Sequence, residues 1–110
     1  MAGTGDTLAF PDGSDYTITA SAGETGGSFV EMEILLPPNA VTPPLHIHPR
    51  QEEDYEVLAG TLEVNYEGDW QRLPEGESMT VRRGEAHTFR NGSGLRVRVR
   101  NVHRPALGFQ

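Results

Sequence analysis

Glycine and proline divide this sequence into segments that are too short for long helices. The chain holds 13 Gly and 8 Pro among its 110 residues, and both residue types interrupt regular secondary structure. No stretch of ten residues shows a convincing apolar period of 3.6, which is the spacing of an amphipathic helix. Short segments in which apolar and polar side chains alternate lie between the turns. The sequence therefore predicts an all-β protein.

The expected strands follow one another at intervals typical of a small sandwich or barrel. They cover residues 16–20, 29–36, 45–48, 54–58, 61–66, 70–73, 78–81, 86–89 and 95–103. The clearest is 29–36, where Val30, Met32 and Ile34 alternate with Glu31 and Glu33. Such alternation indicates a strand with one buried face. The pattern by itself favours a small barrel made of two sheets.

Length and charge limit the classes of protein to consider. One hundred and ten residues suit one domain, 1–110, in which we expect 1–7 to be a flexible tail. The net charge of −7 argues against a nucleic-acid partner. The N-terminus lacks the basic and apolar regions of a secretion signal, and the longest strongly apolar run is residues 34–36. We expect a soluble, cytoplasmic protein with no membrane partner.

Two missing residue types exclude several kinds of chemistry. The sequence has no Cys, which rules out disulfides, thiolate nucleophiles and cysteine zinc sites. It has no Lys either, so a Schiff-base lysine and a phosphate-binding Walker loop are impossible. Any catalysis must use carboxylates, His, Arg, Tyr or a metal ion.

Histidines are the best candidates for binding a metal. His46 and His48 are two residues apart on an expected strand, so their side chains should share one face. Glu53 follows soon after, with Glu52 as the alternative carboxylate, and His87 comes much later. Three imidazoles and one carboxylate could fill four positions of an octahedral site and leave two open for water, substrate or dioxygen.

The spacing of these residues resembles the two conserved motifs of the cupin superfamily. The first reads His46-x-His48, four residues, Glu53, six residues, Gly60. The second reads Gly76, five residues, Arg82, Arg83, Gly84, two residues, His87, three residues, Asn91. Arg82 stands where the family usually has Pro, which affects a turn and not a ligand. The resemblance covers about residues 29–103.

This resemblance implies a jelly-roll barrel of six to eight strands, often dimeric, with a divalent metal ion inside. The expected ligands are His46, His48, Glu53 and His87. The resemblance favours Glu53 over Glu52 for the carboxylate. We therefore expect a homodimer with one Fe, Mn, Ni, Co, Cu or Zn ion per chain.

A metal-dependent dioxygenase that acts on a small, metal-chelating organic substrate is the first functional hypothesis. Alternatives are a non-redox isomerase, lyase or cyclase, in which Glu52, Tyr55 or His103 would move protons, and a non-catalytic small-ligand binder. Our candidate catalytic residues are Glu53, Tyr55 and His103. Alternation along 97–103 places His103 on the inward face, but the nearby Pro105 leaves open a solvent-exposed histidine at the end of the strand.

The same alternation places Arg96, Arg98 and Arg100 on the outward face of the last strand. Glu31 and Glu33 are expected on the outward face of another strand. These charges predict either cross-strand ion pairs or a dimer interface.

Overall fold

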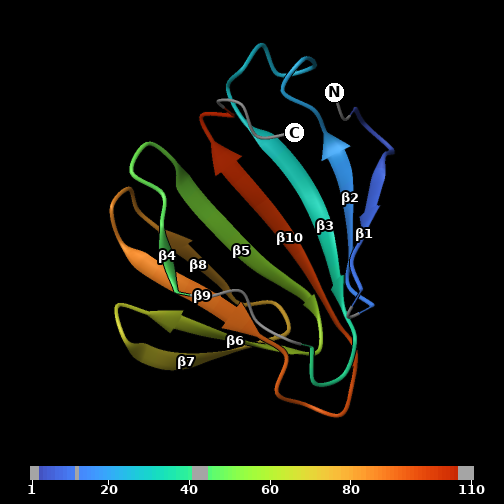
Figure 1. The fold of residues 1–110 in the computed structure, drawn as a ribbon, viewed down its shortest axis with the longest axis vertical. Helices are drawn as coiled ribbons and strands as arrows, with labels where there is room; N and C mark the ends of the chain where they lie inside the picture. Colours follow the sequence, from blue (N-terminus) through green and yellow to red (C-terminus); the bar gives the residue numbers. More distant parts are fainter. Residues whose placement is uncertain (1–2, 12, 41–44, 107–110) are drawn as a thin grey trace.

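Two antiparallel sheets face each other and splay apart at one side of the molecule (Figure 1). The computed structural model describes residues 3–11, 13–40 and 45–106. All regular secondary structure in these ranges is β-strand. The predicted all-β fold, a small jelly-roll barrel of two antiparallel sheets, is confirmed.

The larger sheet has six strands and the smaller sheet has four. In spatial order the larger sheet contains β1 (Thr7–Ala9), β2 (Asp15–Ala20), β3 (Val30–Leu36), β10 (Val97–Arg104), β5 (Glu52–Ala59) and β8 (Ser78–Val81). The smaller sheet contains β4 (His46–Ile47), β9 (Ala86–Arg90), β6 (Thr61–Tyr66) and β7 (Asp69–Pro74). Strands that are neighbours in space are often distant in sequence, as β10 is from both β3 and β5.

The N-terminal strand β1 was not expected from the sequence. Thr7 pairs with Thr17 of β2, and the Gly5 amide donates a hydrogen bond to the Ile18 carbonyl over 2.8 Å. Thr7 therefore begins a paired strand, and the flexible tail expected over 1–7 stays a prediction. All three residues of β1 are exposed, so the strand has no buried face that could produce an alternating pattern.

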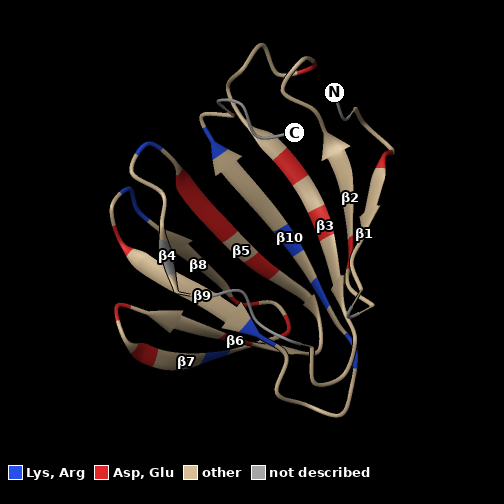
Figure 2. Ribbon diagram, viewed as in Figure 1, with Lys and Arg blue, Asp and Glu red and all other residues tan. Residues whose placement is uncertain are grey.

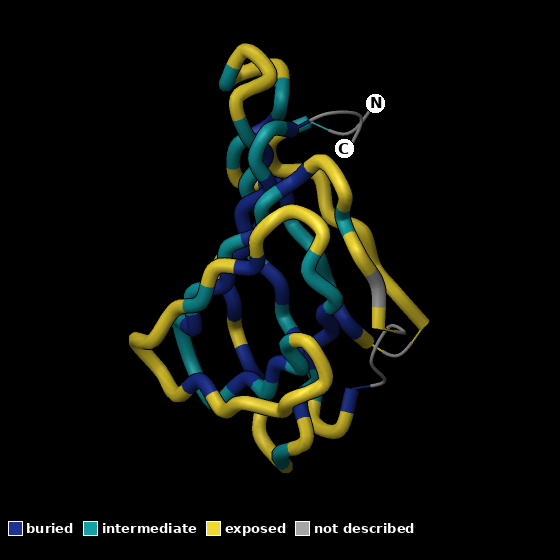
Figure 3. The backbone as a smooth tube through the Cα atoms, turned by 90° about the vertical axis from the view of Figure 1, so that its left-hand side faces the viewer, coloured by how far each residue is buried: buried dark blue, intermediate teal, exposed yellow. Residues whose placement is uncertain are grey.

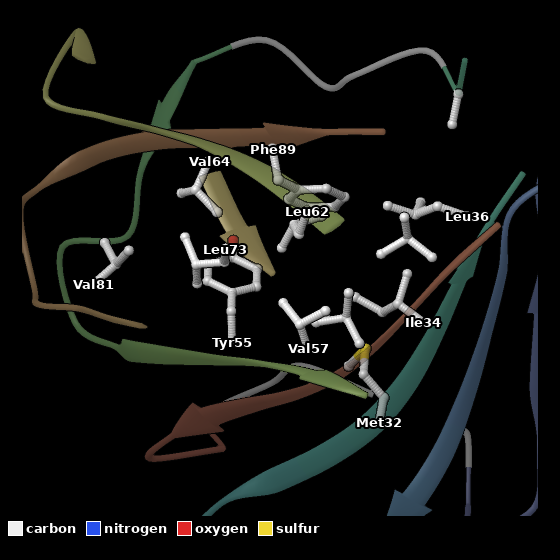
Figure 4. Packing of buried hydrophobic residues seen from close by; sticks show 13 residues of the cluster. Met32, Ile34, Leu36, Tyr55, Val57, Leu62, Val64, Leu73, Val81 and Phe89 are labelled. Atoms are coloured by element: carbon white, nitrogen blue, oxygen red, sulfur yellow. The ribbon is translucent and has the colours of Figure 1, made fainter. Parts of the chain in front are cut away.

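The core lies between the two sheets, where the inward faces of the strands meet (Figure 4). Along β3 the buried positions are Val30, Met32, Ile34 and Leu36, as the alternation predicted. Tyr55 of β5 points into this core. Buried backbone lines the interior, and the exposed segments are mainly loops and edges (Figure 3).

Gly60 turns the chain from β5 in the larger sheet to β6 in the smaller one. Its φ is +82°, and a Cβ atom there would lie 2.7 Å from the Arg96 carbonyl oxygen. This position therefore needs glycine both for its left-handed backbone and for the close approach of the neighbouring chain.

Cross-strand ion pairs lie on the outer face of the larger sheet, which was one of the two arrangements expected for the outward-facing arginines and glutamates. Arg98 contacts Glu33 at 2.7 Å and Arg100 contacts Glu31 at 2.6 Å, both across the β10–β3 pair. Figure 2 shows basic bands on β10 flanked by acidic bands on β3 and β5.

Within the described residues, no helix has the length and apolar character required to span a membrane.

Candidate metal centre

Histidines from both sheets meet around one carboxylate at an end of the barrel. Glu53 on β5 and His103 on β10 lie directly opposite each other in the larger sheet. His87 lies on β9 of the smaller sheet, and His48 follows β4. The Gly84 amide donates to the His48 carbonyl over 3.0 Å, so the turn before β9 holds the segment that carries His48.

Three imidazole nitrogens converge on a single oxygen atom. The Oε2 atom of Glu53 lies 2.9 Å from Nε2 of His87, 3.4 Å from Nε2 of His48 and 3.3 Å from Nε2 of His103. The ligand atoms of His48, Glu53 and His87 all lie within 4.8 Å of one another, which is close enough to share one metal ion. Nitrogen and oxygen donors of this kind suit a divalent transition metal.

The centre is buried except on the side of His48. The side chains of Glu53, His87 and His103 are at most 5% exposed, whereas the His48 side chain is 27% exposed. Among these four side chains, His48 is therefore the one in appreciable contact with solvent. The low exposure of the other groups strengthens every charge interaction among them.

Both ring nitrogens of His87 face hydrogen-bond acceptors. Its Nδ1 atom lies 3.1 Å from the Glu85 main-chain carbonyl, and its Nε2 atom lies 2.9 Å from the Glu53 carboxylate. Both neighbours are hydrogen-bond acceptors, and a neutral imidazole has only one N–H. Either a second proton or a metal ion bound to Nε2 must complete the contact. The carbonyl of Glu85 holds the proton on Nδ1, which is the tautomer that a metal bound through Nε2 needs.

The contacts between Glu53 and the histidines shift the pKa values of Glu53 and His87. Burial alone would raise the pKa of Glu53, but contacts with His103, His48 and His87 outweigh burial and hold this pKa far below its usual range. Burial alone would lower the pKa of His87, but its hydrogen bonds with Glu53 and the Glu85 carbonyl raise this pKa overall. The chain therefore keeps an ionised carboxylate among the imidazoles, which is the form that binds metal.

Asn101 adds a contact to Glu53 that the sequence analysis did not identify. Its Nδ2 atom donates to Oε1 of Glu53 over 2.9 Å, and both side chains are buried. Asn101 shares the buried, inward face of β10 with Val97 and Val99. A polar side chain on a face otherwise made of valines was the sequence signal that could have pointed to Asn101.

Tyr55 lies beside the centre, on the same inward face of β5 as Glu53. Its ring meets that of His87 edge-on with centroids 6.4 Å apart. Burial, followed by the nearby charge of Glu53, raises the pKa of Tyr55 well above its usual range, so the phenol stays protonated. The hydroxyl is buried and has no hydrogen-bond partner among the described residues.

The structure assigns the remaining sequence candidates as follows. His48, Glu53 and His87 are brought together, and the prediction about the His46 side chain lies outside the described part of the structure. Glu52 points away and contacts Arg104 at 3.4 Å, so it is not the carboxylate of the centre. The solvent-exposed alternative for His103 is wrong, because β10 continues to Arg104 and keeps His103 buried.

Comparison with known proteins agrees with this fold. The cupin domain matches residues 32–103, which is more than half of the chain. No curated protein matches the chain in sequence.

Several solved structures are similar to it. KdgF from Halomonas sp. superposes with a TM-score of 0.80 at 18% identity, over 94% of this chain and 88% of that one. The polyketide cyclase RemF from Streptomyces resistomycificus superposes with a TM-score of 0.74 at 24% identity, over 94% of this chain and 70% of that one. An oxalate oxidase superposes with a TM-score of 0.70 at 25% identity, over 87% of this chain and 53% of that one. Together with the match to residues 32–103, these similarities show that the chain belongs to the cupin domain family.

Proposed function

We propose that this chain binds one divalent transition metal ion and acts as a metal-dependent dioxygenase on a small organic molecule that chelates the ion. The ligand atoms of His48, Glu53 and His87, which all lie within 4.8 Å of one another, carry the proposal. The ligands would be His46, His48, Glu53 and His87. His46 is included because the backbone register places it directly opposite His87 in the β4–β9 pair.

The ion would polarise a chelating substrate and, if it were redox-active, support reaction with dioxygen. Fe, Mn, Ni, Co and Cu suit the oxidative step, whereas Zn does not change its oxidation state. The similarity to an oxalate oxidase supports an oxidative reaction.

Two further residues of this chain would handle protons. His103 Nε2 lies 3.3 Å from Glu53, so His103 is placed to take up or release a proton beside the ion. Tyr55 stays protonated, so its buried hydroxyl can donate a hydrogen bond to a polar group that enters the centre. Glu53 would hold the ion and keep the neighbouring imidazoles oriented.

The same proton-transferring groups favour a second candidate, a non-redox isomerase, lyase or cyclase. A buried histidine beside a carboxylate and a protonated tyrosine is an arrangement that suits general acid–base catalysis. The similarity to the polyketide cyclase RemF supports this candidate. Both candidates require the ion, so metal binding is tested first.

We expect protein purified without added metal to contain about one transition metal ion per chain, and His87→Ala to lose most of it. Elemental analysis measures both. Val81→Ala is the matched control, because Val81 is buried and pairs with Glu53 across β5 and β8 but offers no ligand. If His87→Ala keeps the metal content of the wild type, the ligand assignment is wrong.

Dioxygen consumption separates the two candidates. The metal-loaded protein should consume dioxygen with at least one member of a panel of phenols, diketones and flavonols. Turnover of a substrate without dioxygen uptake would favour the non-redox candidate. Metal binding without turnover of any panel member would favour a non-catalytic ligand-binding role.

A further inference from the structure

Asn101 approaches the centre from the strand that lies beside Glu53. Its partner in the β10–β5 register is Tyr55, so its side chain enters the barrel two residues away from His103 on the same strand. The residue is 1% exposed. Solvent therefore cannot replace the contacts of its amide group.

The hydrogen bonds define the orientation of this amide. Nδ2 lies 2.9 Å from Oε1 of Glu53 and 3.3 Å from the main-chain carbonyl of Asp54. Both neighbours are acceptors, so the NH₂ group and not the carbonyl must face them. The Oδ1 atom is buried with no hydrogen-bond partner among the described residues. The amide therefore pairs with Glu53 even though its own oxygen is left unsatisfied.

Because of this hydrogen bond, the two carboxylate oxygens of Glu53 have different neighbours. Oε1 is held by Asn101, whereas Oε2 faces His48, His87 and His103. Without Asn101 the carboxylate could rotate about its last bond and present either oxygen, or both, to the imidazoles. Partners of this kind orient metal ligands, and their loss typically weakens metal binding by about 10- to 100-fold.

We propose that Asn101 is a positioning residue of the metal centre, whose amide anchors Oε1 of Glu53 so that the carboxylate offers only Oε2 to the ion. The inference rests on the proposed metal-binding function. It concerns affinity and ligand geometry, and it makes no claim about which reaction follows.

Titration of the metal-stripped protein with Co²⁺ tests this role, because Co²⁺ reports both its affinity and its ligand geometry through its visible absorption. Asn101→Leu keeps a side chain of similar size but removes the donor, and Asn101→Ala removes the amide without requiring a new side chain to pack. We expect both variants to bind Co²⁺ about 10- to 100-fold more weakly and to shift its absorption bands. Thermal melts of the metal-free variants establish that they fold.

Val99→Ala is the matched control, because Val99 lies on the same strand and face and is equally buried. It should lower the melting temperature but leave the affinity and spectrum for Co²⁺ unchanged. Wild-type affinity and spectrum in both Asn101 variants would overturn the inference while leaving the metal site intact. An equal loss of affinity in Val99→Ala would overturn it too, because the effect would then come from packing. Failure of the wild type to bind Co²⁺ would overturn the proposed function and this inference together.

Discussion

At the scale of single residues, His87 and Glu53 make the stability of the metal-free protein depend on pH from two directions. The pKa of His87 is raised from an ordinary value of 6.5, so its contribution is complete below about pH 6.5 and is lost as the pH rises through the folded-state pKa. The pKa of Glu53 is lowered from 4.5, so its contribution is present above about pH 4.5 and is lost as the pH falls toward the folded-state pKa. The two contributions overlap between these values.

We therefore expect His87 to stabilise the metal-free fold most between about pH 4.5 and 6.5, and less toward pH 9. Urea unfolding of the metal-stripped protein over this range measures the free energy of unfolding. His87→Gln serves as the comparison, because glutamine does not titrate, and its stability should fall less between about pH 6 and 9. Identical alkaline slopes for the two proteins would show that His87 does not carry the effect.

At the scale of elements, Gly60 is the connection on which the passage between sheets depends. Gly60→Ala should lower the free energy of unfolding by at least about 2 kcal/mol, because the left-handed backbone and the contact with the Arg96 carbonyl both oppose a Cβ atom. Gly76→Ala is a matched control with a φ of +88° and open space around it. It should cost only about 1 kcal/mol. Equal losses in denaturant unfolding would mean that the close approach at Gly60 contributes nothing.

The elements themselves were predictable where one face of a strand is buried and the other is not. The segment 29–36 met this condition, and β3 (Val30–Leu36) forms there with every second residue buried. β4 was expected over 45–48 but spans only His46–Ile47, and β1 was missed. Short or fully exposed strands form because a neighbouring strand supplies hydrogen bonds, and the local sequence carries no pattern that indicates such a neighbour.

At the scale of the whole molecule, the candidate metal centre draws its residues from both sheets. Glu53 belongs to the larger sheet and His87 to the smaller one, so an ion bound by both would stabilise the packing of one sheet on the other. At a free metal concentration about 100 times Kd, the folded state should gain about 2.7 kcal/mol, or about 10 °C in melting temperature. Thermal melts with Co²⁺ and with a chelator measure this shift. An unchanged melting temperature in His87→Ala on adding metal is the expected control, and a wild-type shift there would contradict the site.

The outer ion pairs bear on assembly at the same scale. Arg98 and Arg100 contact Glu33 and Glu31 within one chain, so these charges do not need a second copy for pairing. Exposed pairs of this kind contribute little to stability, because solvent screens the charges. The expected homodimer and the cytoplasmic location stay predictions.

The sequence alone determined the fold class, the inward faces of the long strands and three residues of the centre, because alternation and motif spacing are local properties of the chain. Only the tertiary structure showed that Glu52 contacts Arg104, buried His103 beside the Glu53 carboxylate, and joined Asn101 to Oε1 of Glu53. These outcomes depend on which strands become neighbours and in what register. β10 lies between β3 and β5, which are far from it in sequence, and no local pattern specifies that pairing.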